Sequence, residues 1–464
     1  MTTSRTSIAL SPRDIVNAGL CIGCGSCVAQ AGPSVADVRL DTYGHYKPAG
    51  SAAWMARRSL PFTRTCPFSP GARNEDQLAA ALYPAAAHQD PLIGRFDTAY
   101  VGYVAEQDFR AGGSSGGMVS WVASELLRLG LVDSVAHVAP APDPQQAGQF
   151  FGYRFSRTQD ELRAGAKSRY YPVELSDVLR TVRSVPGRYA VVGVPCFIKA
   201  VRLLQREDPV VRDRVRFTLG LFCGHMKSAR LVESFAWQMG VRVDEIARVE
   251  YRLKDFNRPA SWYTAHLTLR DGRTVQKDWF HLADGDWGAG FFQNEACNFC
   301  DDVVAETADI SFGDAWLEPY SSDGGGTNVV VVRSPVLRDL VASGIVEGRL
   351  HLDAVDEKFV QETQAAGFRQ RREGLAYRLT WRRPAHRPRK RVAPDSHSPT
   401  LRRKLIYRMR SQITAQSHRV FWLARRTGRP ALYIRWAGMA LTIYHGLAYS
   451  QGKLGAFLER WGLH

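Results

Sequence analysis

The sequence lacks an uninterrupted apolar run near the ~18 residues that a membrane-spanning helix needs. The longest apolar stretch, WAGMALTIYHGLAY, is shorter and includes His445. The N-terminal stretch MTTSRTSIALSPRDIVNAGL has no apolar signal-peptide core. No internal repeat of about 20–50 residues is apparent, which excludes a solenoid or propeller array. We therefore expect a cytoplasmic protein, soluble or peripherally attached to a membrane, in which disulfides are disfavoured.

Acidic residues are scarce at the C-terminal end. The net charge is +16, basic residues dominate from Arg369 onward, and after Gly374 only Asp395 and Glu459 carry carboxylates. We interpret residues 365–464 as a basic helical tail that attaches the protein to a partner, separately from its core.

Within this tail, apolar side chains recur at helical spacing between arginines, at Leu401, Leu405, Met409 and Ile413. Such helices bind anionic membrane surfaces or acidic protein partners. Nucleic acid is disfavoured as a partner because no recognised binding fold accompanies the charge. An arm packed onto the body, or onto a second subunit, is the alternative.

Eight cysteines divide into two sets of four. The first set comprises Cys21, Cys24, Cys27 and Cys66. Three thiols in a C-x-x-C-x-x-C run, with a separate Cys-Pro, are typical of the 4Fe–4S sites of bacterial ferredoxins. Gly23 and Gly25 let the loop turn sharply. Zinc is the rival metal, but structural zinc prefers two separated C-x-x-C pairs.

The second set combines two strand ends with one loop. Its members are Cys196, Cys223, Cys297 and Cys300. YAVVGVPC and RFTLGLFC each predict a buried strand that ends in a cysteine and is followed by a helix. Such β-α-β-α units pair their strands in parallel, so both cysteines would face the carboxyl edge of the sheet. EACNFCDD adds a C-x-x-C pair, which makes a second cluster; buried small hydrophobes, a zinc site or a catalytic thiol are the alternatives.

A glycine-rich loop, RAGGSSGG, follows the apparent strand TAYVGYV and precedes an amphipathic helix. Small residues at a helix N-terminus can bind phosphate. The loop matches neither G-x-G-x-x-G nor the lysine-containing P-loop, so an ordinary strand-to-helix connection is equally compatible with it.

Together these stretches resemble the beta-subunit family of coenzyme F-420-reducing hydrogenases and dehydrogenases. That family is similar to 7-hydroxymethyl chlorophyll a reductase and to ferredoxin-dependent divinyl reductases. The matching stretches are CIGCGSC, CPF, GGSSGGMVS, AKSRYYPVE, GVPCFIKAVR, GLFCGH, CNFCDD and ADISFGDAW. The resemblance covers about two-thirds of the chain, and it implies an iron–sulfur flavoprotein.

The resemblance also implies where FAD binds. Its pyrophosphate or ring edge would be held by Gly113, Ser114, Ser115, Gly116 and Gly117. Further support would come from Lys167, Ser168 and Arg169. The second cysteine set favours the two-cluster form of the family. No deazaflavin-specific residue can be assigned, although coenzyme F-420 is a candidate cofactor.

Three further residues are weighed as site residues. Asp314, at the end of an apparent strand, could line the flavin site or cap a turn. His225 could protonate a substrate at a hydride-accepting carbon, but a structural role is favoured for a lone loop histidine. Lys254 could meet an anionic substrate or could solvate a strand edge.

We therefore predict a mixed α/β (α+β) protein with a ferredoxin-like N-terminal segment, an α/β flavin-binding body and the basic helical tail. The predicted regions are 1–80 (4Fe–4S segment), 95–190 (flavin-binding), 191–350 (second cysteine set) and 365–464 (tail).

The predicted activity is that of an FAD- and iron–sulfur-dependent oxidoreductase. A ferredoxin or a deazaflavin would donate electrons that pass through the clusters and FAD, with hydride transfer to or from an organic substrate. The alternatives are a non-catalytic electron-transfer subunit of a larger complex and a zinc-stabilised binding protein without redox activity.

Overall fold

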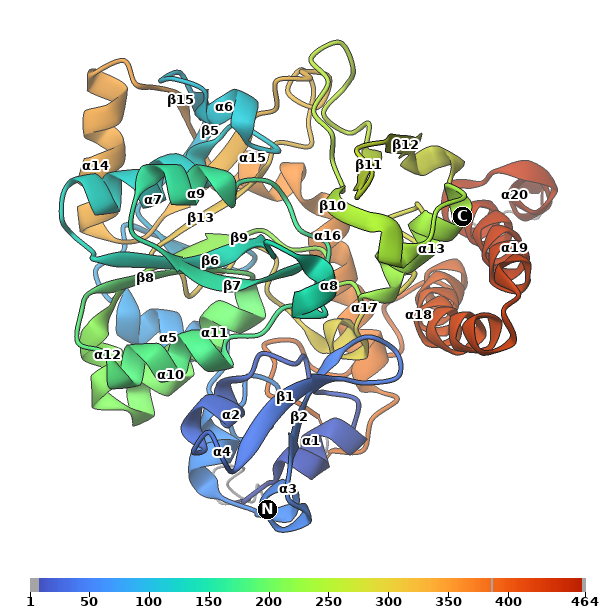
Figure 1. Cartoon of the computed structure of the whole chain (residues 1–464), viewed down its shortest axis with the longest axis horizontal. Helices are drawn as coiled ribbons and strands as arrows, with labels where there is room; N and C mark the ends of the chain where they lie inside the picture. The colour runs from blue at the N-terminus through green and yellow to red at the C-terminus, as the bar shows by residue number, and fades with distance from the viewer. Residues whose placement is uncertain (1–7, 385–386, 461–464) are drawn as a thin grey trace.

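An eight-stranded sheet forms the centre of the molecule, shown in Figure 1 as a computed structural model. The structure describes residues 8–384 and 387–460. From one edge to the other the strands are β15 (Leu350–Val355), β5 (Thr98–Val104), β14 (Asn328–Val332), β13 (Ile310–Asp314), β9 (Val215–Leu221), β8 (Tyr189–Gly193), β6 (Ser134–Pro140) and β7 (Phe151–Ser156). The four consecutive strands β13, β9, β8 and β6 pair in parallel, and the remaining pairs are antiparallel. The predicted mixed α/β class is confirmed.

Helices pack on both faces of this sheet because its central strands are apolar on both sides. In β8, Val191 belongs to one core together with Phe197, whereas Ala190 and Val192 belong to the other together with Trp121. The helices around the sheet are α6 (Phe109–Gly112), α7 (Met118–Arg128), α8 (Pro144–Ala147), α9 (Gln159–Ala164), α10 (Ser176–Ser184), α11 (Pro195–Glu207), α12 (Pro209–Arg214), α13 (Arg230–Gln238) and α14 (Pro335–Val346).

The parallel strands end at one common edge of the sheet. Gly193 in β8 lies opposite Gly220 in β9, so the two carboxyl ends coincide. Cys196 lies in the first turn of α11, directly after β8, and Cys223 follows β9 by two residues. Asp314 ends β13, the next parallel strand. The expectation that both cysteines follow neighbouring parallel strands is confirmed.

The N-terminal segment lies beside the end of α10 and α11, at the bottom of Figure 1. Backbone contacts hold it there: the Leu175 amide donates to the Cys24 carbonyl (2.9 Å), and Arg180 donates to the Ala36 carbonyl (2.8 Å). Its elements are α1 (Pro12–Asn17), α2 (Ser26–Gln30), β1 (Ala36–Leu40), β2 (Tyr46–Gly50), α3 (Ala52–Ala56) and α4 (Leu60–Thr65). Three elements connect it to the sheet, namely α5 (Glu75–Leu82), β3 (His88–Asp90) and β4 (Gly94–Phe96).

A second, three-stranded antiparallel sheet lies between β9 and β13 in the sequence. It consists of β10 (Ile246–Glu250), β11 (Thr264–Leu269) and β12 (Thr274–Asp278). The dipeptide Asp271–Gly272, a sequence signal typical of hairpin turns, joins β11 to β12, and Gly272 adopts a left-handed φ of 86°. Short 3-10 helices surround this sheet and the cysteine loop, at η2 (Val243–Glu245), η3 (Trp279–His281) and η4 (Glu295–Phe299).

The tail is helical, as predicted, but the prediction that it is separate from the core is wrong. Its helices, which follow α15 (Glu357–Thr363), are α16 (Ala365–Arg371), α17 (Glu373–Leu379), α18 (Leu401–Thr427), α19 (Pro430–Tyr449) and α20 (Gly452–Arg460). Ile413, Phe421 and Tyr433 are buried in the same apolar core as the strands. The Ser417 hydroxyl accepts a hydrogen bond from the Phe292 amide at 3.0 Å. The alternative of an arm packed onto the body is therefore the correct one.

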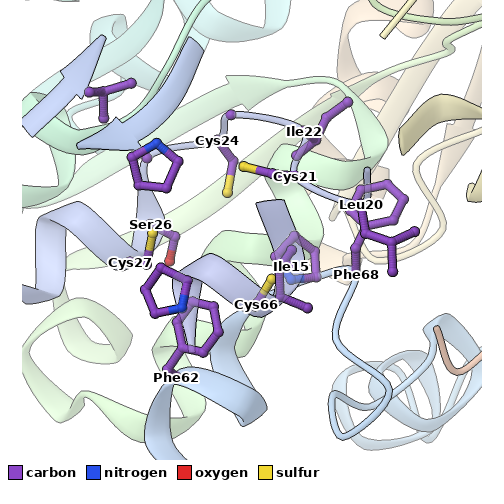
Figure 2. A pocket seen from close by; sticks show the side chains of 16 residues that line it. Ile15, Leu20, Cys21, Ile22, Cys24, Ser26, Cys27, Phe62, Cys66 and Phe68 are labelled. Carbon is purple, nitrogen blue, oxygen red and sulfur yellow. The ribbon is translucent and has the colours of Figure 1, made fainter. Parts of the chain in front are cut away.

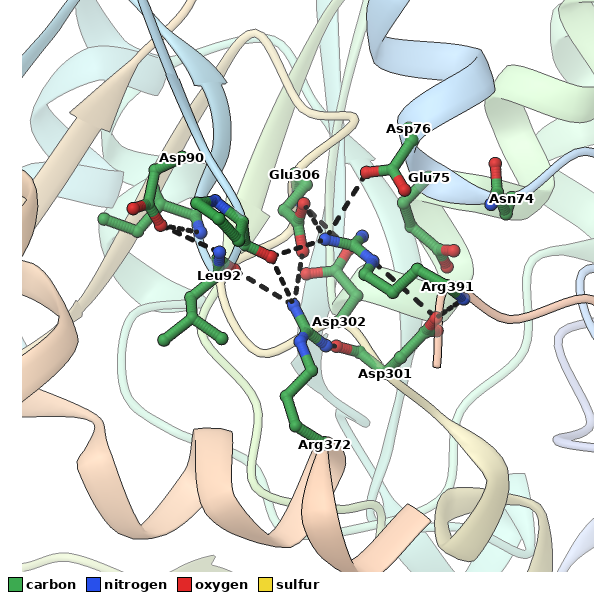
Figure 3. A network of polar contacts seen from close by, with 12 residues as sticks. Asn74, Glu75, Asp76, Asp90, Leu92, Asp301, Asp302, Glu306, Arg372 and Arg391 are labelled. Atoms are coloured by element: carbon green, nitrogen blue, oxygen red, sulfur yellow. Dashed lines mark hydrogen bonds and ion pairs between the residues drawn. The ribbon is translucent and has the colours of Figure 1, made fainter. Parts of the chain in front are cut away.

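Part of the basic charge of the tail is also buried (Figure 3). Lys390 lies 2.6 Å from Asp301, and Arg391 lies 2.7 Å from Glu306, with both carboxylates essentially inaccessible. Since unpaired buried carboxylates are costly, these cations stabilise the body. The sequence predicted that the positive charge of the tail lies on the protein surface. At Lys390 and Arg391 this charge is instead buried inside the protein.

Along the described parts of the chain, no helix combines the length and apolar character needed to cross a membrane.

Phe421 is a test of whether the tail belongs to the core. Its ring stacks on Trp237 (centroids 4.3 Å apart) and contacts Phe292 and Tyr433. Phe421→Ala should lower the free energy of unfolding by about 3–5 kcal/mol, because it leaves a cavity among buried rings. Trp422→Ala, at the exposed neighbouring position, is the control and should cost far less. Equal melting temperatures for the two variants would mean that the tail does not stabilise the body.

Candidate functional site

The first cysteine set surrounds one cavity (Figure 2). The apolar lining of the cavity includes Ile15, Phe62 and Phe68. All four predicted thiols line it, namely Cys21, Cys24, Cys27 and Cys66. Local backbone explains this convergence, because Gly23 (φ 80°) and Gly25 (φ 78°) occupy the left-handed region that lets the loop turn.

Burial makes three of these thiols reluctant to ionise on their own. Desolvation raises the pKa of Cys66 to about 12, and it raises the pKa values of Cys24 and Cys27 well above the ordinary thiol range. Neighbouring thiols of the set raise the pKa values of Cys24 and Cys27 further. A cationic group in the cavity would therefore be required to hold these three as thiolates.

The second set surrounds another cavity, of about 270 Å³. It is lined by Cys196, Cys223, Cys297 and Cys300. The structure thus brings together one thiol from the end of each of two strands and two thiols from the C-x-x-C loop, as the sequence predicted. The Met226 amide donates to the Cys297 sulfur at 3.3 Å. Desolvation raises the pKa of Cys223 to about 12 and that of Cys297 to about 11.

The two cavities are adjacent. Phe68, two residues after Cys66, lines both of them, and Cys24 lies near enough to Cys196 to raise its pKa. Across the described ranges, no group of three or more His, Cys, Asp or Glu side chains is arranged to hold a metal ion. The sulfurs instead line cavities, and their role as ligands stays a prediction.

The glycine-serine loop lies between α6 and α7, at the end of β5. The Ser168 amide donates to the Ser114 hydroxyl at 2.8 Å, so the structure joins the two stretches predicted to hold FAD. Gly117 is the N-cap of α7 and has a φ of 87°. A Cβ on Gly116 would lie 2.8 Å from the Gly102 carbonyl oxygen and from Asn328 Oδ1. A glycine is therefore required at position 116 by close packing between the loop and the sheet.

Lys254 holds the glycine-serine loop in place through hydrogen bonds to backbone carbonyls. Its ammonium donates to the Ser115 carbonyl (3.0 Å), the Gly325 carbonyl (2.7 Å) and the Arg110 carbonyl. Burial, followed by the charges of Lys167 and Arg110, lowers the pKa of Lys254 to about 8. Lys254 was a candidate for contact with an anionic substrate, but its contact with the loop could not be predicted from sequence, because the two segments are far apart in the chain.

Lys167 and Arg169, which were also predicted to support the flavin, contact residues outside the glycine-serine loop. Lys167, with a left-handed φ of 95°, forms an ion pair with Glu250 at 2.7 Å. Arg169 packs over Phe151, and its buried Nε has no hydrogen-bond partner among the described residues. Such an unsatisfied donor is compatible with a bound acceptor.

Asp314 and Arg252 form a buried ion pair at the end of β13. Arg252 donates to the Asp314 carboxylate at 2.9 Å, and its guanidinium lies 4.3 Å from the centroid of the Tyr263 ring. Sequence reasoning singled out Asp314 but missed Arg252, whose position carries no local motif.

His225 is buried and stacks on Trp287, with ring centroids 4.3 Å apart. Desolvation, followed by the charges of Lys227 and Arg410, lowers its pKa well below the usual value, so the imidazole is neutral at pH 7. Trp287 also contacts Tyr170 (4.7 Å), the residue after Arg169. Aromatic rings thus connect the second cavity with the stretch predicted to hold FAD.

Two family models match the chain, and they are named for the N-terminal and C-terminal parts of the beta subunit of coenzyme F-420 hydrogenase/dehydrogenase. They cover residues 99–180 and 187–358, more than half of the chain. The protein therefore belongs to the coenzyme F-420 hydrogenase/dehydrogenase beta-subunit family, as the sequence motifs predicted.

Two known proteins are similar to this chain. The chain is 23% identical over 245 residues to the coenzyme F-420 hydrogenase subunit beta of Methanothermobacter thermautotrophicus, covering 50% of this chain and 76% of that protein. A chain of the F-420-reducing nickel–iron hydrogenase complex from Methanosarcina barkeri is similar at 18% identity and a TM-score of 0.49, covering 64% of this chain and 96% of that one.

The close approach at Gly116 gives a direct test of the loop. Gly116→Ala should lower the free energy of unfolding by about 1–3 kcal/mol, because its methyl group overpacks against the Gly102 carbonyl. Gly112→Ala, in the same loop but with nothing within 4 Å of the added methyl, is the control and should change stability by less than about 0.5 kcal/mol. Urea unfolding of both variants measures the difference, and equal midpoints would contradict this packing.

Proposed function

We propose that the protein is an oxidoreductase that binds two 4Fe–4S clusters and FAD and transfers electrons between a ferredoxin or a deazaflavin and an organic substrate. The observation that carries this proposal is the arrangement of eight thiols, four around each of two adjacent cavities that share Phe68. Family membership supports it.

The cysteine sets fit clusters better than isolated zinc ions. A single zinc ion needs its four sulfurs about 2.3 Å from one point, whereas a cubane binds one thiolate at each of its four irons. Thiols that line a cavity match the second arrangement. When bound, the clusters would supply one-electron transfer, and FAD would supply the exchange between one-electron and hydride chemistry.

Residues of the glycine-serine loop would hold the pyrophosphate of FAD. The positive end of the α7 dipole favours an anion, although the Met118 amide already donates to Asn328 Oδ1 at 3.1 Å. Lys254 places positive charge beside the loop, whereas Arg110 is paired with Asp323. The buried Arg169 Nε, which has no partner among the described residues, would supply a further donor for such a group.

A non-catalytic electron-transfer subunit is the second candidate. The Methanosarcina barkeri relative is described as part of a hydrogenase complex, and a corresponding role here would need a protein partner. Turnover by the isolated protein with a chemical reductant favours the enzyme, while activity only with an added partner favours the subunit. An optical spectrum separates both from a zinc protein, which would be colourless.

The predicted partners of the tail fit its outward surface. Helices α18 and α19 contain no carboxylate residue, and their exposed positions include Arg419, Arg426, Arg435, Trp422 and Leu423. An acidic protein partner and an anionic membrane surface both stay predictions.

Iron content tests the two clusters separately. Wild-type protein purified without oxygen should contain about eight irons per chain. Cys24→Ala and Cys196→Ala should each reduce this to about four, because each removes one ligand from a different cavity. Ser26→Ala, which changes a lining residue without a thiol, should retain all eight. Zinc in place of iron, or unchanged iron in either cysteine variant, would rule out the assignment.

Flavin affinity should depend on pH through Lys254. Below about pH 8 the side chain is protonated and attracts the pyrophosphate; as the pH rises through about 8 it loses this charge, so FAD should bind more weakly. Lys254→Met should weaken binding at pH 7 roughly tenfold to a hundredfold, because it removes both a positive charge near the pyrophosphate and the three hydrogen bonds that fix the loop. Lys254→Arg keeps the charge and should remove the decline above pH 8. Fluorescence titration measures each affinity, and an unaltered pH profile in Lys254→Arg would contradict this role.

A further inference from the structure

Arg371, the last residue of α16, reaches the wall of the second cavity. Only 3% of its surface is exposed. Its Nη2 donates to the Cys223 carbonyl at 2.7 Å and to the Gly224 carbonyl at 2.5 Å. These two bonds fix the guanidinium plane directly beside a predicted ligand.

The other terminal nitrogen of Arg371 is unsatisfied. Nη1 is buried and has no hydrogen-bond partner within the described part of the chain. A buried donor of this kind costs about 1–3 kcal/mol unless an acceptor is present. The remaining lining of the cavity consists of the four cysteines, Phe68, Val194, Pro195 and Met226, so its acceptors are sulfur atoms.

Arg371 forms no direct ion pair. No described carboxylate lies within ion-pair distance of it, although Arg372 and Arg391 both pair with Glu306. Asp302 acts on the Arg371 charge only from beyond that distance. Nη1 therefore has no acceptor unless a group bound in the cavity supplies one.

No lysine or arginine lines the first cavity, and Phe68 is the side chain that it shares with the second cavity. Lys47 donates to the Cys21 carbonyl at 2.7 Å, but its side chain is not part of the cavity lining. A hydrogen bond and a positive charge near cluster sulfurs stabilise the reduced, more negative form. Two otherwise similar clusters would thus differ in reduction potential.

We infer that Arg371 is a positioning residue that donates Nη1 to a sulfur of the second 4Fe–4S cluster and raises the reduction potential of that cluster above that of the first. This inference rests on the proposed function, because it requires a cluster in the second cavity. Gain of one electron adds one negative charge, which the guanidinium stabilises. Electrons entering at the first cavity would then move favourably towards the second.

The test is a redox titration of the full-length protein, with dithionite as the reductant and electron paramagnetic resonance as the readout. Wild type should show two midpoint potentials. Arg371→Gln should lower the higher one by at least a tenfold change in the reduction equilibrium, about 59 mV for one electron, and leave the lower one unchanged. Arg371→Lys keeps the charge and should restore part of the shift.

Arg372→Gln is the matched control. Arg372 carries the same charge in the adjacent position, but it donates to the Asp301 and Leu92 carbonyls outside the cavity. Both midpoints should stay within a twofold change of equilibrium in this variant. An equal shift in the two glutamine variants would mean that general charge, and not the contact of Arg371, sets the potential, which overturns the inference.

Iron content distinguishes failure of the inference from failure of the proposed function. About four irons in wild type would remove the second cluster and with it the proposed function. About eight irons, with both midpoints unchanged in Arg371→Gln, would overturn the inference alone. If Arg371→Gln does not retain its second cluster, wild type labelled with nitrogen-15 arginine decides the question. An exchangeable proton and an arginine nitrogen coupled to the reduced second cluster support the contact, and absence of both couplings contradicts it.

Discussion

A buried network of opposite charges joins three distant parts of the chain beside the second cysteine loop (Figure 3). Asp301, directly after Cys300, pairs with Lys390 of the tail, which also lies 4.0 Å from Glu75 near the N-terminal segment. Lys199 of α11 pairs with Glu75 at 3.0 Å. Removal of one partner from such a network typically costs about 3–5 kcal/mol, since it leaves an uncompensated buried charge. The cysteine loop is held in place by these contacts, and the position of its thiols depends on them.

The central sheet explains why both candidate sites meet at one edge. Parallel strands β8 and β9 end side by side and deliver Cys196 and Cys223 to the same cavity. β13 ends beside them with Asp314, which binds Arg252 near the aromatic rings. In an open α/β sheet the carboxyl edge is where loops can gather ligands without disturbing the core. The N-terminal segment then places the first cavity against the second.

Local patterns predicted much of this arrangement. The structure contains three features that depend on only a few adjacent residues. They are the glycine-containing turn of the C-x-x-C-x-x-C loop, the strands followed by a cysteine and the Asp271–Gly272 hairpin. The tail was misjudged, because alternating apolar and basic residues describe a helix with one apolar face but not the surface that covers this face. In this protein the apolar face of the tail packs on the body. The Phe421 ring contacts the Phe292 ring, and the Phe292 amide donates to the Ser417 hydroxyl. Arg371 and Arg252 were missed because single arginines carry no motif.

The sequence by itself determined the class of protein, the two sets of four thiols and the glycine-serine loop, because these depend on residue type and short spacing. Only the tertiary structure decided that the two cysteine sets share Phe68, that Lys254 fixes the loop and that Arg371 faces the second cavity. These contacts join residues tens to hundreds of positions apart. Burial then changes their chemistry, because a charge or a thiol removed from water depends on its few immediate neighbours, which no local pattern specifies.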